Sequence, residues 1–145
     1  MRFVFVLLSY AVLSCASPTT GQSDDRFTVS VQDNPERQRF DVSVTSHSPE
    51  TLCLSPEFWP NAHGWMPAAP QTATVTIGAA RYPIDGNYNA GFCPGDECST
   101  RVEPGATVTG FIIYQRFAIP LDLVHVPKVL DFSPRAHVCE IGRER

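Results

Sequence analysis

The sequence predicts an all-β domain, namely an antiparallel, immunoglobulin-like β-sandwich of about seven or eight strands with little helix. Apolar and polar residues alternate with a period of two in several short runs, and no window keeps a helical apolar period free of proline or strand alternation. Thirteen prolines and nine glycines separate these runs by frequent turns. The likeness to immunoglobulins is architectural, since the antibody Cys-Trp-Cys spacing is missing, and a small β-barrel is the alternative.

Two neighbouring strands open the domain. The alternation of apolar and polar residues at 27–32 returns at 40–45, and the segment 33–36 between them, Asp-Asn-Pro-Glu, has the composition of a turn. We therefore expect an antiparallel pair. A short strand at 51–54 follows, and it carries Cys53.

The later part of the chain supplies the remaining strands. The most apolar β-compatible stretch is 106–117, which we expect to be a central strand. The run 72–77 alternates again and is expected to form a hairpin with 81–84. Shorter strands are expected at 101–105, 129–132 and 136–141, the last two forming either a terminal hairpin or two strands joined across the sandwich.

Length and charge limit the class of protein. With 145 residues, the chain has room for one packed domain. Asp and Glu number 15 against 11 Lys and Arg, which gives a formal net charge of -4. A nucleic-acid-binding surface needs a basic patch, and the sequence has none. We therefore expect no nucleic-acid partner.

The first 15 residues have the layout of a secretory signal. Met1 and Arg2 precede a mostly apolar run at 3–13, and small residues follow at 14–17. As a helix this run would reach only about 16 Å, whereas a hydrocarbon layer is roughly 30 Å thick. We therefore expect an exported chain without a permanent transmembrane helix.

The junction Val-Leu-Ser-Cys at 12–15 resembles the lipobox of bacterial lipoproteins, in which the cysteine receives lipid and becomes the mature amino terminus. The resemblance implies lipidation at Cys15. Ala16, the next residue, resembles the outer-membrane sorting pattern of Gram-negative bacteria. Leu13 departs from the smaller residue that is usual in the family. Ordinary cleavage after Ala16, which would give a secreted soluble protein, is therefore the alternative.

The segment 16–25 contains no large apolar residue, and its small and polar composition suits a flexible tether. The β-sandwich domain is then expected to occupy 26–145. With a lipid at the amino terminus, the expected location is the periplasmic face of a bacterial membrane, with the outer membrane favoured.

The cysteines agree with an oxidising compartment. Without Cys15, an even set of four remains. The tetrapeptide Pro-Gly-Asp-Glu between Cys93 and Cys98 forms turns readily and can bring the two within disulfide reach, so we pair these two, and Cys53 with Cys139. The spacing lacks the C-x-x-C pairs of zinc sites and of thioredoxin-like redox sites.

Both tryptophans lie in a segment at 55–67 that prolines stiffen. Aromatic side chains on a pre-ordered loop lose little entropy on association, which makes this segment the candidate binding loop. The alternative is that the rings cap an open end of the sandwich. The candidate residues are Phe58, Trp59, His63, Trp65 and Met66.

A second segment has some features of a calcium loop. Oxygen-bearing side chains alternate at Asp85, Asn87 and Asn89, and Asp96 takes the place of the last ligand. The sixth position is Ala90 instead of glycine, and the last ligand is Asp instead of Glu. A tight turn is therefore the preferred interpretation, and we expect no bound metal.

No motif in the sequence indicates catalysis. The four histidines are scattered without metal-binding spacing. The G-x-S-x-G motif of hydrolases and the glycine-rich loops of nucleotide-binding proteins are missing. We therefore name no catalytic residue and expect no cofactor.

These observations predict an exported, lipid-anchored, non-catalytic protein of the bacterial envelope that acts as a binding or assembly module. The expected partner is an envelope protein or glycan, and the expected membrane contact is the lipid anchor. One alternative is a secreted protease inhibitor that presents 55–67 or 85–98 to a protease cleft. Another is a small envelope hydrolase.

Overall fold

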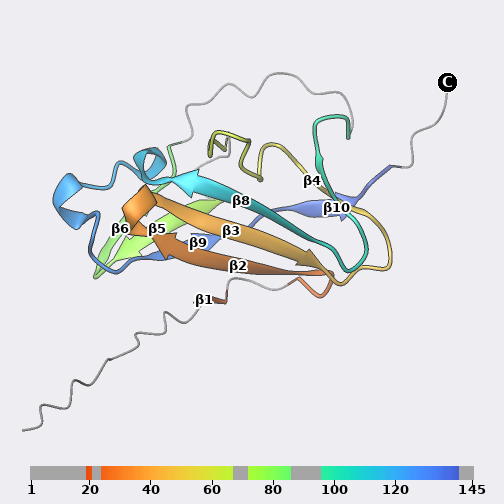
Figure 1. Cartoon of the computed structure of the whole chain (residues 1–145), viewed down its shortest axis with the longest axis horizontal. Helices are drawn as coiled ribbons and strands as arrows, with labels where there is room; N and C mark the ends of the chain where they lie inside the picture. The colour runs from red at the N-terminus through yellow and green to blue at the C-terminus, as the bar shows by residue number, and fades with distance from the viewer. Residues whose placement is uncertain (1–18, 21–23, 67–71, 86–95, 141–145) are drawn as a thin grey trace, which may run out of the picture.

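Two layers of antiparallel strands face each other in the computed structural model of this protein (Figure 1). The structure describes residues 19–20, 24–66, 72–85 and 96–140. Within these residues the secondary structure consists of ten β-strands and three short 3-10 helices, so the predicted all-β sandwich is confirmed. None of the three sheets formed by these residues closes into a barrel.

The first layer is a four-stranded sheet in the order β1-β2-β3-β8. The 3-10 turn Pro35–Arg37 joins β2 to β3, and the side chain of Asn34 caps it by accepting a hydrogen bond from the Arg37 amide. The predicted antiparallel pairing of β2 and β3 is confirmed. The strands are β1 (Thr19–Thr20), β2 (Phe27–Asn34), β3 (Arg39–Ser46) and β8 (Thr107–Ile113).

The short strand β1 lies within the segment that the sequence predicts as a tether. Thr19 pairs with Val31 of β2, and Thr20 pairs with Ser30. The remainder of 16–23 lies outside the described residues. Two residues of the expected tether therefore extend the first layer beyond β2.

The predicted signal, 1–15, and its lipidation site Cys15 also lie outside the described residues. In the part of the chain that the structure covers, no helix combines the length and the apolar character needed to cross a membrane. Helix is confined there to the 3-10 turns Pro35–Arg37, Tyr114–Phe117 and Leu121–Leu123.

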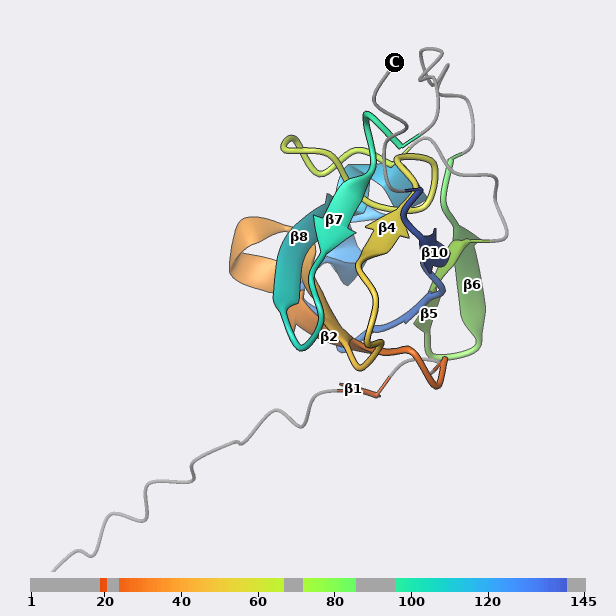
Figure 2. The same cartoon turned by 90° about the vertical axis from the view of Figure 1, so that its right-hand side faces the viewer.

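The second layer consists of two three-stranded sheets, β6-β5-β9 and β10-β4-β7. β9 and β10 follow each other along one line but pair with different strands, β5 and β4, so they join the two sheets within the layer (Figures 1 and 2). The predicted hairpin of β5 and β6 is confirmed. Of the two alternatives for the last strands, the terminal hairpin is wrong, because β9 and β10 do not pair with each other. The strands are β4 (Leu52–Leu54), β5 (Ala73–Ile77), β6 (Ala80–Pro83), β7 (Thr100–Val102), β9 (Val129–Phe132) and β10 (Ala136–Val138).

The core fills the space between the two layers. On β3 and β5 every second residue is buried, as their sequence alternation requires. An aromatic cluster forms part of this core, where the ring of Phe40 is 4.9 Å from that of Tyr114 and 5.9 Å from that of Phe117. These tilted and edge-on arrangements are the favourable geometries for aromatic pairs.

The segment 106–117 differs from its prediction as a central strand. Only Thr107–Ile113 forms a strand, and β8 stands at the edge of its sheet, paired with β3 alone among the described strands. The chain then turns into the 3-10 helix Tyr114–Phe117, which buries its aromatic rings in the core. The prediction failed because the last third of the apolar stretch forms this helix.

A loop covers β8 at the edge of the sheet, which explains why this edge strand carries apolar side chains. We call residues 55–66 the Trp loop. A Cβ atom added at Gly110 of β8 would lie 2.9 Å from Cγ of Pro60 and 3.3 Å from Cζ2 of Trp59. The Trp loop therefore lies against β8, and coverage of this kind protects an edge strand from pairing with another chain.

Cys53 and Cys139 form a disulfide, which confirms the predicted pairing. Their Cα atoms lie 5.0 Å apart although 86 residues separate them in the sequence. The bond ties β4 to the residue that follows β10. Cys98 is disulfide-bonded as well, and its predicted partner Cys93 lies outside the described residues.

A lysine lies inside the sandwich. The Lys128 side chain is 0% exposed, and its ammonium group is 3.3 Å from the Asp33 carboxylate. It donates hydrogen bonds to the carbonyl oxygens of Val124 (2.6 Å) and Val126 (2.9 Å), and it lies 4.6 Å from the centroid of the Tyr114 ring. The Tyr114 hydroxyl donates to the same carboxylate. Burial, together with this bond to Asp33, raises the pKa of Tyr114 above its ordinary value.

Candidate ligand-binding groove

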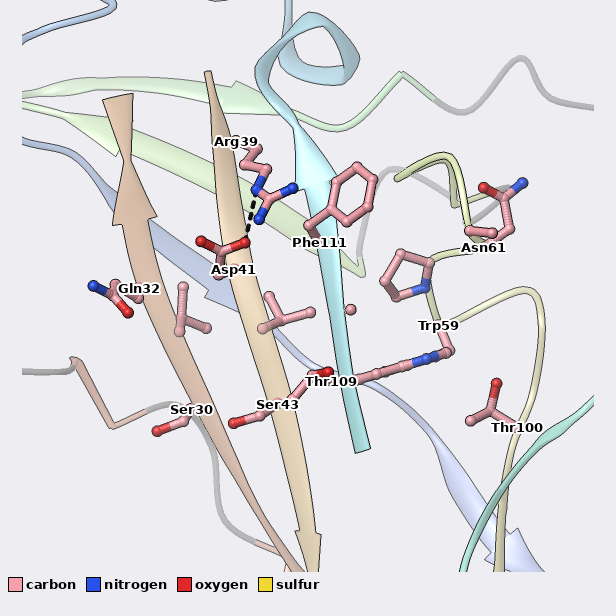
Figure 3. Close-up of a pocket in the computed structure, with 15 residues that line it drawn as sticks. Ser30, Gln32, Arg39, Asp41, Ser43, Trp59, Asn61, Thr100, Thr109 and Phe111 are labelled. Carbon is pink, nitrogen blue, oxygen red and sulfur yellow. Dashed lines mark ion pairs between the residues drawn. The ribbon is translucent and has the colours of Figure 1, made fainter. Parts of the chain in front are cut away.

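A groove of about 710 Å³ lies on the outer face of the first layer (Figure 3). Its floor is the surface of β2, β3 and β8 that points away from the core. Its wall is the part of the Trp loop at 59–62, and Thr100 of β7 also lines it. The groove therefore combines a flat sheet surface with a loop that stands beside it.

The floor is built from rows of side chains that run across the strands. Residues at paired positions of neighbouring strands point to the same face. Ser30 pairs with Ser43, and Ser43 pairs with Thr109, which gives a row of three hydroxyls. Gln32 and Asp41 pair in the next row, roughly 7 Å along the strands. Figure 3 shows these side chains extending from the three strands.

The polar side chains of the floor keep their capacity for hydrogen bonds. Within the described residues, the side chains of Ser30, Gln32, Ser43 and Thr109 neither donate nor accept a hydrogen bond. Binding pockets place a small number of such groups toward a ligand to fix its orientation. The row is therefore available to a ligand that carries donors and acceptors.

One end of the groove holds two opposite charges. Nε of Arg39 lies 2.7 Å from Oδ1 of Asp41, and Nδ2 of Asn34 donates to Oδ2 at 2.9 Å. The N–H at Nε is not aimed at the carboxylate, so the contact is an ion pair without an aligned hydrogen bond. The guanidinium group also lies 4.6 Å from the centroid of the Phe111 ring. The positive and negative charges compensate each other at short range.

Asn61 holds the wall in shape. Its Oδ1 accepts hydrogen bonds from the backbone amides of His63 (2.9 Å) and Trp65 (3.1 Å), and the backbone amide of Asn61 donates to the Trp65 carbonyl at 2.9 Å. Gly64 takes a φ of 74° inside this turn, and its carbonyl accepts a hydrogen bond from the Ile113 amide at 3.4 Å. The wall is thus fixed to the strand that forms one side of the floor.

Trp59 agrees with both interpretations of the candidate binding loop, the one as a cap of the core and the one as a binding surface. It is 5% exposed, and its ring centroid lies 6.3 Å from that of Phe132, so it fills the core at the edge of β8. It also lines the groove, where its ring lies against Gly110 of β8. Met66, by contrast, is fully buried and does not line the groove.

The other three candidate residues also lie outside the groove. Phe58 is half-buried beneath the guanidinium group of Arg135, which lies 4.6 Å from its ring centroid. Trp65 is half-buried beneath Arg116 at 4.9 Å. His63 is exposed on the turn. The structure therefore brings one of the five candidates, Trp59, to the groove.

The floor of the groove is not among the residues that the sequence predicts as a binding site. Ser30, Gln32, Asp41 and Ser43 are the outward partners of the alternating apolar residues, and outward residues of a strand are usually just solvated. The available signal was the run of small hydroxyl residues at paired positions. The wall turns this flat polar surface into a groove. No local sequence pattern predicts where the Trp loop lies.

The calcium candidate is only partly described. Asn87 and Asn89 lie outside the described residues. The Asp96 carboxylate is engaged, since Oδ1 lies 2.7 Å from Nε2 of His137 and Oδ2 accepts from the Glu140 amide at 2.7 Å. The hydrogen bond from His137, followed by that from the Glu140 amide, lowers the pKa of Asp96. Asp96 therefore serves to hold the segment that follows β10.

One group of side chains within the described residues has the composition of a metal site. Ligand atoms of Cys53, Asp96 and His137 lie within 4.8 Å of one another. The sulfur of Cys53 is bonded to Cys139, so it is not available as a thiolate ligand. Asp96 and His137 remain, and they are bonded to each other.

Comparisons of the chain with protein-family models, with curated proteins and with solved structures give no match. The groove on the first layer is therefore the feature from which a function can be proposed.

Proposed function

We propose that this protein is an exported, lipid-anchored, non-catalytic module of the bacterial envelope that binds a ligand in the groove of its first layer. The observation that carries the proposal is the hydroxyl row Ser30, Ser43 and Thr109, which finds no hydrogen-bond partner among the side chains and backbone that the structure describes and lies beside a preformed wall. A preformed site loses little conformational entropy when a ligand binds.

The composition of the groove favours binding over catalysis. General acid–base and nucleophilic catalysis depend on groups such as histidines, thiols or paired carboxylates placed to act on a substrate. The groove instead presents hydroxyls, amides and apolar surface, and its two charged side chains, Arg39 and Asp41, compensate each other. These groups can orient a ligand and hold it.

Export is supported by the signal layout and by the disulfide, and lipid attachment by the resemblance of residues 12–15 to the lipobox. A disulfide such as Cys53–Cys139 persists in oxidising compartments and is rare in the cytosol. Growth with an alkyne analogue of palmitate tests the anchor, because the wild-type chain should incorporate the label and the Cys15→Ser variant should not. Label that remains on Cys15→Ser would contradict the anchor.

A matched pair of variants tests the groove. Thr109 and Thr107 are both exposed on β8 and point to the same face, but only Thr109 lines the groove. Thr109→Tyr should fill the groove, whereas Thr107→Tyr adds the same ring two residues away. Both substitutions suit an exposed strand position because tyrosine has high β-propensity.

The measurement is retention of envelope components on the immobilised full chain, with each retained fraction identified by mass spectrometry. We expect the wild type and Thr107→Tyr to retain the same component, and Thr109→Tyr to lose it. Equal retention by all three proteins, or retention of nothing by any of them, would contradict the proposal. Circular dichroism of the two variants verifies that both remain folded.

A further inference from the structure

The floor of the groove is matched to a ligand whose hydrogen-bonding groups both donate and accept. Each serine or threonine hydroxyl carries one donor and two acceptor lone pairs, and the Gln32 amide carries both kinds of group. In the row of Ser30, Ser43 and Thr109, three hydroxyls follow one another on adjacent strands roughly 5 Å apart, and none of them has a hydrogen-bond partner in the described part of the chain. A ligand with several hydroxyls in sequence can form hydrogen bonds with such a row, and no donor or acceptor is then left buried and unpaired.

The charge of the groove is matched to a neutral ligand. Arg39 and Asp41 are its charged lining residues, and their side chains lie 2.7 Å apart. The formal net charge of the whole chain is -4, which gives an anionic ligand no long-range attraction. A charged ligand would also have to compete with the existing ion pair. The groove therefore offers no net charge to recognise.

The wall adds apolar surface beside these polar groups. Trp59 and Pro60 are themselves buried, so the apolar surface open to a ligand is that of Ala62 and of the Phe111 ring, at the end where Arg39 lies. Sugar rings have the complementary character, since they carry hydroxyls around the edge and C–H groups on the faces. Contact of those C–H faces with aromatic carbon removes apolar surface from water.

The position of the groove disfavours an extended peptide. Peptides that bind sheets do so mainly by adding a strand to a free edge, where backbone donors and acceptors are unpaired. The floor of this groove is the face of the sheet, and its central strand β3 is hydrogen-bonded on both sides, to β2 and to β8. A ligand above β3 meets side chains and not a free backbone.

We infer that the ligand of this groove is an uncharged oligosaccharide, which lies across β2, β3 and β8 with its hydroxyls on the serine and threonine row and a ring face against the apolar surface at Ala62 and Phe111. This inference rests on the proposed function and specifies its ligand.

The test uses isothermal titration calorimetry of the full chain with defined probes. The neutral probes are the hexasaccharides of cellulose, of maltose-type glucan and of chitin. The charged probe is the hexamer of galacturonic acid, and the peptide probe is a hexapeptide of Ser, Thr and Gly. We expect at least one neutral probe to bind, with an affinity that stays the same between 50 and roughly 500 mM salt, because no charge pairs across the interface.

Variants locate the binding and test the charge argument. Thr109→Tyr should lower the affinity for the neutral probe at least roughly tenfold, and Thr107→Tyr should leave this affinity unchanged. Asp41→Asn leaves Arg39 without its carboxylate and should admit the galacturonate hexamer, which the wild type should reject. A loss of stability in Asp41→Asn does not obscure the result, because the titration is carried out well below the melting temperature of this variant.

Preference of the wild type for the galacturonate hexamer or for the peptide would overturn the inference, and so would binding by none of the probes. The proposed function survives these results if an envelope component is still retained in a manner that Thr109→Tyr abolishes. The proposed function is contradicted only if the retention assay also fails.

Discussion

The ring of Phe111 lies directly against Gly64. A Cβ atom added at Gly64 would lie 2.4 Å from Cε2 and 2.6 Å from Cδ2 of this ring. Gly64 also adopts a φ of 74°, a conformation that residues with a side chain rarely take. Two separate demands therefore require glycine here, and together they fix the groove wall to β8.

Replacement of Gly64 should cost more stability than replacement of Gly105. Gly105 has a φ of 72°, almost the same as Gly64, but a Cβ atom there would meet nothing within 4 Å. Gly105→Ala should therefore cost only the backbone strain, about 1–2 kcal/mol, and Gly64→Ala should cost roughly 1–3 kcal/mol more because of the clash. Urea unfolding of both variants measures the difference, and equal losses would contradict the contact with Phe111.

The two tryptophans should differ in their contribution to stability. Trp59 is 5% exposed and packs beside Phe132, so Trp59→Ala should lower the free energy of unfolding by roughly 3–5 kcal/mol. Trp65 is only half-buried, and Trp65→Ala should cost clearly less, since it loses mainly the contact with Arg116. Thermal and urea unfolding compare the two variants. A greater loss for Trp65→Ala would contradict this packing.

Removal of the Cys53–Cys139 disulfide should destabilise the protein strongly. The bond closes a loop with a sequence separation of 86 residues, and the chain-entropy relation gives about 4.5 kcal/mol for a loop of this length. The double variant with alanine at both positions should show this loss in urea unfolding under non-reducing conditions. The wild type in the presence of a dithiol reductant loses the disulfide of Cys98 as well, so its loss of stability should be at least as great. A loss below about 1 kcal/mol would show that the unfolded chain gains little freedom.

Tyr114 should make the protein sensitive to alkali. Because its pKa is raised in the folded state, the hydroxyl stabilises the fold fully below the ordinary tyrosine pKa of about 10, and this contribution is lost as the pH rises above it. The unfolded chain ionises there while the folded one stays protonated. Tyr114→Phe should be the less stable protein at pH 8, and its disadvantage should shrink at pH 11. Urea midpoints at the two pH values give the comparison, and parallel pH profiles would refute it.

Asp96 should contribute stability that acid removes. Its pKa is lowered in the folded state, chiefly by the hydrogen bond from His137, so the contribution is present above the ordinary aspartate pKa of 3.8 and is lost as the pH falls through the folded value. Asp96→Asn should therefore be less stable than the wild type at pH 7, and the two should converge at low pH. Glu97→Gln, at the exposed neighbouring position, should follow the wild type at both pH values. A difference that persists at pH 2 would contradict this role.

Local alternation was sufficient to predict much of the fold. The pair β2 and β3 and the hairpin of β5 and β6 follow from residues close together in the chain, so a pattern of period two with a turn between the runs identifies them. The bond between Cys53 and Cys139 also followed, because the other two cysteines were close enough to be paired first.

Contacts between distant segments could not be predicted in this way. The apolar content of β8 indicated coverage on both sides, but the covering element is the Trp loop and not a neighbouring strand. The groove has the same origin, since its floor is visible as a row of small polar residues only after Trp59 and Pro60 are known to lie beside Gly110. Sequence spacing carries no information about such an approach.

Lys128 is the only lysine in the chain, and the fold encloses its amino group completely. Acylating reagents that modify lysines should therefore pass over this position in every intact molecule and mark it only in molecules that have opened. A mass shift on the peptide that contains Lys128 would count the opened fraction directly, without an added dye or an engineered probe.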